Sequence, residues 1–164
     1  MDGRLNGRLR IEMESMHTFQ SNEILTGIAI IGVLKITEEL EISKCLLIEP
    51  LLSYKSIHDY LKNANSKVRS IEELMVKQNI VFSNFNKRYQ EKLPLSINSI
   101  MLMSQLKLLN IESSKLIFTG DTFDFNEKSL GKTAKDIIAT GSNLAEILTK
   151  EEASSLYLSL RVEL

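Results

Sequence analysis

Residues 131–133, Gly-Lys-Thr, are the part of this sequence most similar to a site for phosphate chemistry. They match the end of a phosphate-binding loop, in which backbone amides and a lysine hold a nucleotide. A complete loop also needs a glycine five residues earlier and a strand directly before it. Asn126 stands at that glycine position. The motif therefore predicts a chain break near the start of a helix and no nucleotide site.

Two groups of potential metal ligands also lack the required spacing. Asp121, Asp124 and Asn126 resemble part of a calcium loop, but the central glycine and the final bidentate glutamate are not in register. A solvated turn explains them better. His17 and His58 are far apart, and neither has a cysteine, histidine or carboxylate at metal-ligand spacing. We expect no metal ion and no cofactor.

Residues that could carry out covalent or acid–base catalysis are equally sparse. The single cysteine, Cys45, lies in an apolar run and is expected to be a buried small side chain. His58 and Asp59 are adjacent, so on a helix they point about 100° apart and are not expected to orient each other as a dyad. The sequence therefore predicts a protein that binds other macromolecules, with no enzymatic activity and no small-molecule substrate.

The bulk composition is that of an ordinary globular protein. Of the 164 residues, 43% are hydrophobic and 25% are charged, with a net charge of -1, so one core can form but no general attraction to nucleic acid or membranes is indicated. The longest apolar stretch, residues 28–34, is far shorter than the roughly 20 residues of a membrane helix. No secretory signal follows the first basic residues. These features predict a cytoplasmic protein.

The polar, arginine-rich residues 1–21 show no sustained period and are interpreted as a flexible leader. A coding start at Met13 or Met16 explains their character equally well. Residues 22–164 contain no repeat, linker or low-complexity tract, so they are expected to form a single, mostly helical domain.

Helical periodicity begins at Asn22, a good N-cap for apolar positions that continue to Leu34. Gly27 and Gly32 lie inside this helix, where each costs about 1 kcal/mol relative to alanine. Two such residues indicate a close backbone approach to a neighbour. Further along, Pro50 must either kink a helix or open a new one.

Capping signals predict the later helices. Ser70 and Glu73 form a capping box, and residues 149–152 form a second one. Pro94 is expected to end the helix that follows Ser70, and Ser96 is expected to start the next. Helical spacing returns over residues 130–148.

Between these helices lies one segment with strand character. Residues 115–119 and 122–125 flank Gly120 and Asp121, which together predict a two-residue hairpin turn. The expected fold class is mainly α with a small β-hairpin. A helix followed by a hairpin is also the order of a winged helix.

The composition of the helix before the hairpin argues against sequence-specific DNA binding. Residues 97–110 are apolar around nearly the whole circumference and lack an Arg, Lys or Asn stripe, so this helix is expected to be buried in the core or against a protein. We predict a winged-helix-like unit used for protein contact, with a winged-helix DNA-binding regulator and a plain helical domain as alternatives. The candidate interface residues are Gly27, Gly32, Ile97, Met101, Met103 and Leu106.

Several segments together resemble a known family. They are Asn-Glu-Ile at 22–24 before a Gly/Ala-rich apolar helix, Leu-Leu-Ile-Glu-Pro-Leu-Leu at 46–52, and the runs at 69–74, 85–89 and 95–100 that lead into the hairpin. This arrangement resembles the middle components of bacterial three-component ABC systems, relatives of the Lamassu-type antiphage operons. The resemblance extends over roughly residues 19–162.

The resemblance implies an accessory role. In that family the small protein is encoded with an SMC/Rad50-like ABC ATPase and a third component, often an effector. It implies a non-enzymatic subunit that docks on the ATPase and couples its state to the effector, with DNA at most a shared ligand of the complex. It carries no catalytic residues over to this chain.

Overall fold

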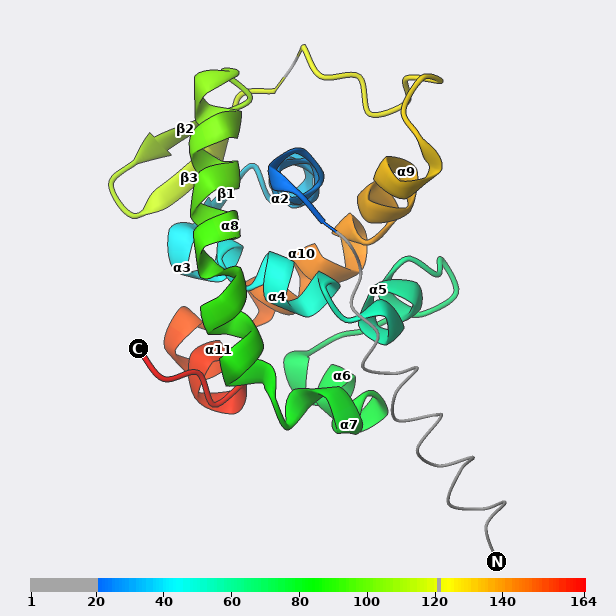
Figure 1. Ribbon diagram of the computed structural model, residues 1–164, viewed down its shortest axis with the longest axis vertical. Helices are drawn as coiled ribbons and strands as arrows, with labels where there is room; N and C mark the ends of the chain where they lie inside the picture. The colour runs from blue at the N-terminus through cyan, green and yellow to red at the C-terminus, as the bar shows by residue number, and fades with distance from the viewer. Residues whose placement is uncertain (1–20, 121) are drawn as a thin grey trace, which may run out of the picture.

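The computed structural model describes residues 21–120 and 122–164. Figure 1 shows helices arranged around one central helix, with a small sheet at one side. In order, the elements are α2 (Glu23–Thr37), β1 (Glu39–Glu41), α3 (Ile42–Cys45), α4 (Ile48–Leu52), α5 (Lys55–Leu61), α6 (Ile71–Lys77), α7 (Asn79–Phe82), α8 (Phe85–Gln105), β2 (Leu109–Glu112), β3 (Lys115–Phe118), α9 (Lys132–Ala139), α10 (Gly141–Lys150) and α11 (Ala153–Ser159). The predicted leader, except Ser21, lies outside the described residues, and the single domain over 22–164 stays a prediction.

Helix α2 is the centre of the core. All nine residues from 26 to 34 are buried, as expected of a helix that is apolar on every side. Figure 1 looks nearly along its axis and shows α8 on one side and α9 and α10 on the other. The predicted cap is confirmed, because the Asn22 Oδ1 accepts hydrogen bonds from the amides of Ile24 at 3.1 Å and Leu25 at 2.9 Å.

Three of the other helix starts also agree with the sequence. Ser70 Oγ accepts a hydrogen bond from the Glu73 amide at 3.2 Å, while the Glu73 carboxylate accepts one from the Arg69 amide at 3.0 Å. Pro50 lies in the first turn of α4, so it opens a new helix, where its missing amide hydrogen costs nothing. Gly131 is the N-cap of α9, which agrees with the predicted break at a helix start.

The prediction that Pro94 separates two helices is wrong. Helix α8 runs without interruption for 21 residues, with Pro94 in its interior. Because proline has no amide hydrogen, the carbonyl of Gln90 lacks its usual helical hydrogen bond from residue 94. Gln90 is exposed, so water can bind this carbonyl instead. Tyr89 and Ser96 are buried on either side of the proline and keep both halves of the helix on the core.

The strand prediction is correct for one strand and wrong for its partner. β3 corresponds to the predicted strand 115–119, but it pairs with β2, which precedes it, and not with residues 122–125. The turn is formed by Ser113 and Ser114, because Ser113 adopts a left-handed φ of 54°. Residues 122–125 instead place Phe123 and Phe125 in an edge-to-face ring contact, with centroids 4.7 Å apart.

The small sheet has three antiparallel strands in the order β1-β3-β2. β1 lies directly after α2 and pairs Leu40 with Leu116, so the hairpin is attached to the central helix. The predicted fold class, mainly α with a small hairpin, is confirmed. The order α8, β2, β3 follows the predicted helix–hairpin sequence, and the winged-helix-like unit stays a prediction. Among the described residues, no helix combines the length and apolarity needed to cross a membrane.

The C-terminal helices differ from the prediction in two places. The helix expected over 130–148 is divided at Thr140, whose hydroxyl donates to the Ile137 carbonyl at 2.6 Å. The prediction of a second capping box at residues 149–152 is also wrong. The Thr149 hydroxyl donates a hydrogen bond to the Ala145 carbonyl at 2.7 Å, and α10 continues to Lys150. In both cases the hydroxyl binds a carbonyl in the preceding turn and is not used as a cap.

Candidate partner-binding surface

The exposed side of α8 carries apolar side chains in its C-terminal half. Ile97 is 47% exposed and Met101 is 50% exposed, and four residues place them one turn apart on the same face. Pro94, a further turn away, is also exposed. We call these three residues the outer face of α8. Residues 97–110 were expected to form a helix buried in the core or against a protein. The helix ends at Gln105, and within this chain only one side of it is covered, so burial in the core alone does not account for it and contact with a protein stays a prediction.

The inner side of α8 packs on α2 through two other predicted residues. Gly27 and Met103 are both buried, and a Cβ atom built on Gly27 would lie 2.8 Å from Met103 Cγ. The close approach expected at Gly27 is thus made by a side chain. Both residues pack within the chain, so they are not part of the outer face.

The remaining two predicted residues lie elsewhere. Gly32 is buried, and its backbone carbonyl faces Gly141, the first residue of α10. A Cβ atom built on Gly141 would lie 3.3 Å from the Gly32 carbonyl oxygen, so the backbones of α2 and α10 come close together at this point. Leu106 is 55% exposed at the C-cap of α8. It lies nine residues after Ile97, about half a turn around the helix, and does not extend the outer face.

A buried carboxylate joins α8 to the helices behind it. Glu49 of α4 is 3% exposed; one of its oxygens accepts a hydrogen bond from the Thr26 hydroxyl at 2.8 Å, and the other lies 3.7 Å from Lys92 Nζ. Ser21 also donates to it. Burial raises the pKa of Glu49, and these three partners offset only part of that effect. This cluster connects α2, α4 and α8, and no sequence pattern indicated it.

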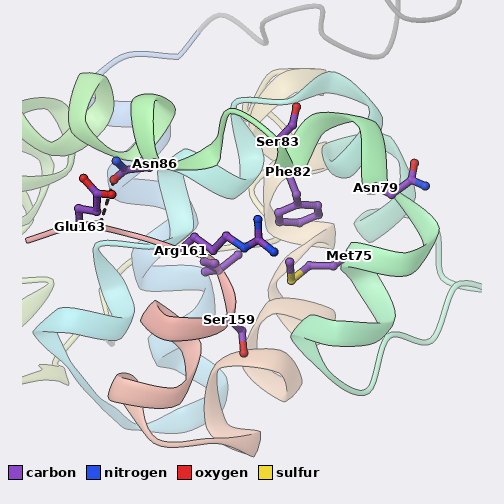
Figure 2. Close-up of a pocket in the computed structure, with 9 residues that line it drawn as sticks. Met75, Asn79, Phe82, Ser83, Asn86, Ser159, Arg161 and Glu163 are labelled. Atoms are coloured by element: carbon purple, nitrogen blue, oxygen red, sulfur yellow. Dashed lines mark hydrogen bonds between the residues drawn. The ribbon is translucent and has the colours of Figure 1, made fainter.

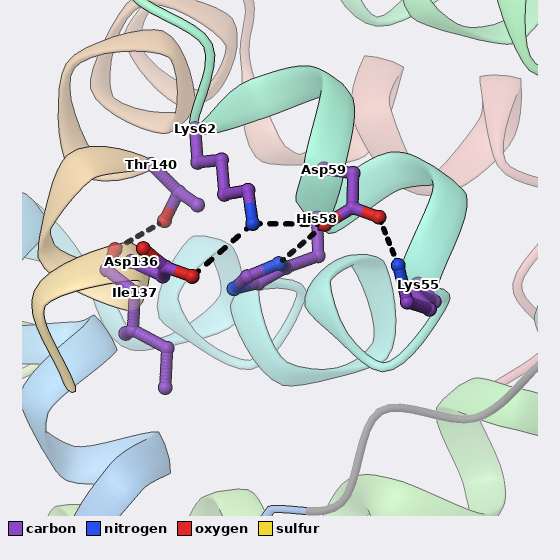
Figure 3. Close-up of polar contacts among 7 residues, drawn as sticks. All are labelled: Lys55, His58, Asp59, Lys62, Asp136, Ile137 and Thr140. Carbon is purple, nitrogen blue, oxygen red and sulfur yellow. Dashed lines mark hydrogen bonds and ion pairs between the residues drawn. The ribbon is translucent and has the colours of Figure 1, made fainter. Parts of the chain in front are cut away.

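A second charged cluster connects α5 to α9 (Figure 3). Lys62 lies 3.1 Å from both Asp59 and Asp136, and Lys55 also pairs with Asp59. Burial raises the pKa of Asp59, but hydrogen bonds from the two lysines outweigh it and hold the value at about 2. These charges neutralise one another, which suits a connection between helices better than a ligand site.

His58 belongs to this cluster and is 1% exposed, and burial lowers the pKa of its imidazole. Its Nδ1 atom lies 3.6 Å from Asp59 Oδ1. The two adjacent side chains therefore come closer than helical geometry predicted, although this distance exceeds that of a good hydrogen bond. Cys45 is buried as predicted, and burial raises its pKa to about 12. Within residues 21–120 and 122–164, no three potential ligands are grouped to hold a metal ion.

Two hollows lie at the C-terminal end of the chain. One, of about 410 Å³, is an apolar groove between α3, α8 and α11. At this groove the Tyr157 hydroxyl donates to the Ser43 carbonyl at 2.7 Å and lies 3.1 Å from the Tyr89 hydroxyl. The other, of about 320 Å³, lies between α6, α7 and the segment after α11 and contains Arg161 (Figure 2). No sequence pattern indicated a role for Arg161, because Met75 and Phe82, which line the same pocket, are far from it in the chain.

The features of this chain are therefore packing clusters, an exposed apolar helix face and surface hollows. Comparison with curated proteins and with solved structures finds no match. A family model described as "ABC-three component (ABC-3C) system Middle Component 3" matches residues 30–164, which is most of the chain and includes every element from α3 to α11. The chain belongs to this family of middle components.

Proposed function

We propose that this protein is the non-enzymatic accessory subunit of a bacterial antiphage complex in the cytoplasm. It docks on an SMC/Rad50-like ABC ATPase and couples the state of that ATPase to a third, effector component. It acts on no small-molecule substrate, and DNA is at most a shared ligand of the assembly.

Membership of the middle-component family is the observation that carries this proposal. A component of a three-component system needs surfaces for other proteins, and the outer face of α8 offers one. Ile97 and Met101 leave about half of their surface in water on consecutive turns. Full burial of such a side chain is worth about 1.5–3 kcal/mol, so a partner that covers both gains affinity.

The alternative of a winged-helix DNA-binding regulator has one observation in its favour, the order α8, β2, β3. The outer face of α8 argues against it, because this face presents Pro94, Ile97 and Met101 where a recognition helix presents groups that reach base edges. A salt-dependent shift of duplex DNA by the protein alone supports the regulator, and no binding at low salt removes it.

Co-purification tests the proposed function. The tagged protein is co-expressed with the ABC ATPase encoded beside its gene, and the complex is isolated by size exclusion. We expect the wild type to bring the ATPase with it and the double variant Ile97→Glu, Met101→Glu to lose it. Both side chains are half exposed, so the variant should keep the wild-type unfolding temperature.

Leu158→Glu is the matched control. Leu158 is 81% exposed on α11, so the change also replaces an exposed apolar side chain with a charge but leaves α8 unaltered. It should retain the ATPase. If the wild type does not bind the ATPase, the accessory role is wrong. If it binds and the α8 variant binds equally well, the outer face of α8 is not the docking surface.

A further inference from the structure

The hollow beside Arg161 has an apolar floor. Met75 and Phe82 face it from α6 and α7, and Leu160 faces it from the end of α11. Its volume of about 320 Å³ is at the lower end of the range for ligand pockets and is enough for one or two side chains of a partner. We call it the Arg161 pocket.

The two helices that line the Arg161 pocket also carry exposed apolar side chains. Val76 and Ile80 directly follow two residues that line the pocket, and they are 78% and 43% exposed. They lie four positions apart, the spacing of one helical turn, although α6 gives way to α7 between them. The Arg161 pocket therefore combines an apolar floor with polar lining side chains, among them Asn79, Asn86 and Ser159, and exposed apolar side chains lie on the same two helices. Such a combination is typical of protein-binding surfaces.

Arg161 places a positive charge over this floor. Figure 2 shows its side chain reaching from the C-terminal segment towards Phe82 and Met75. No carboxylate in the described part of the chain forms an ion pair with it. Glu163 also lines the pocket, but its amide donates to Asn86 Oδ1 at 3.1 Å, and Figure 2 shows it beside Asn86, away from the guanidinium.

The backbone at Arg161 is left-handed, as it also is at Glu38 after α2 and at Lys107 after α8. The φ of Arg161 is 54°, at the position after α11 where glycine is the most common residue. This conformation is strained for an L-residue.

We propose that the Arg161 pocket binds a segment of a partner protein that carries an apolar side chain close to an aspartate or glutamate. The apolar side chain fills the floor between Phe82 and Met75, and the carboxylate pairs with the Arg161 guanidinium. Arginine suits this role because its planar fork donates two parallel hydrogen bonds to one carboxylate. The pocket thus favours a segment that brings an apolar side chain and a carboxylate together.

Selection from an unbiased peptide library displayed on phage tests this inference with the full chain as target. We expect the enriched peptides to combine an acidic residue with a bulky apolar residue a few positions away. Synthetic copies, measured by fluorescence polarisation, should bind Arg161→Glu at least about tenfold more weakly, because one carboxylate pair is lost and a repulsion is gained. Val76→Asp, at an exposed position outside the core, should also weaken binding.

Lys128→Glu makes the same change of charge on an exposed loop residue outside the pocket and should bind the peptides like the wild type. Three results would overturn the inference: no enrichment, enriched peptides without acidic residues, or equal binding by the wild type and Arg161→Glu. The inference rests on the proposed role as a docking subunit, but this assay contains no ATPase. A negative peptide-binding result therefore does not affect the co-purification result, and a negative co-purification result does not affect the peptide-binding result.

Discussion

At the residue scale, the contact between α2 and α8 depends on the absence of a side chain at Gly27. A Cβ atom there would overlap Met103, including its Cγ at 2.8 Å, whereas a Cβ atom on Gly32 in the same helix meets nothing within 4 Å. We expect Gly27→Ala to lower the free energy of unfolding by about 1–3 kcal/mol through overpacking.

Gly32→Ala is the matched control for that contact. It should raise the free energy of unfolding by about 0.5–1 kcal/mol, since alanine loses less backbone entropy than glycine in a helix. Urea denaturation followed by circular dichroism measures both variants. Equal losses in the two would show that the Met103 contact is not the cause.

Glu49 makes stability depend on pH. Burial raises its pKa, so the folded protein holds this proton more tightly than the unfolded chain does. Its contribution to stability is present below the usual glutamate pKa and is lost as the pH rises through the folded value. We expect the stability of Glu49→Gln relative to the wild type to improve with rising pH over that range.

Denaturation curves for the wild type and Glu49→Gln at a series of pH values give this difference directly. Glu73→Gln is a useful comparison, because hydrogen bonds from Lys77 and Arg69 lower the pKa of that partly exposed carboxylate. Its difference from the wild type should change in the opposite direction. Parallel curves for Glu49→Gln and the wild type would contradict the assigned role of Glu49.

At the scale of elements, three helices end in a charged residue with a left-handed backbone. Glu38, Lys107 and Arg161 follow α2, α8 and α11 with φ values of 65°, 59° and 54°. No described glycine adopts a positive φ. Each of these ends therefore carries a conformational cost that glycine would remove.

We expect Lys107→Gly to raise the free energy of unfolding by about 1 kcal/mol, because it relieves the left-handed strain without removing a buried contact. Lys107→Ala keeps the Cβ atom and should give no comparable gain. Thermal unfolding compares the two. Arg161→Gly should give a similar gain in stability but lose the acidic peptide, which would separate the role of this side chain in binding from its cost in folding.

At the scale of the whole molecule, one asparagine attaches a loop to a distant helix. Asn143 of α10 donates to the carbonyls of Leu61 and Ser66, both at 2.9 Å, and accepts from the Val68 amide at 3.3 Å. We expect Asn143→Ala to lower the free energy of unfolding by about 1–3 kcal/mol, since it leaves partly buried backbone groups unpaired.

The loop should also become less protected from amide hydrogen exchange in this variant, particularly at Val68. Asn63→Ala is the control, because the Asn63 side chain accepts a local hydrogen bond from the Asn65 amide in the exposed part of the same loop. Its effect should be a few tenths of a kcal/mol. Unchanged exchange in Asn143→Ala would contradict the proposed attachment.

Features that depend on neighbouring residues could be predicted from the sequence alone. The caps at Asn22 and Ser70, the helix that opens at Pro50 and the burial of Cys45 all follow from side-chain chemistry within one or two turns or from an apolar run. The mainly α class and the family resemblance are sums of such local patterns, so they too could be predicted.

Which side of each element is covered depends on how the elements pack in three dimensions. Helix α8 continues through Pro94 because contacts on both sides hold it to the core, and its outer face is exposed because α2 and α4 cover only the other side. The pairing of β3 with β2 and the meeting of Arg161 with Phe82 likewise join parts of the chain whose contact no local period records. The physical reason is that burial is a property of the packed molecule, so the same apolar pattern along a helix can be either core or surface.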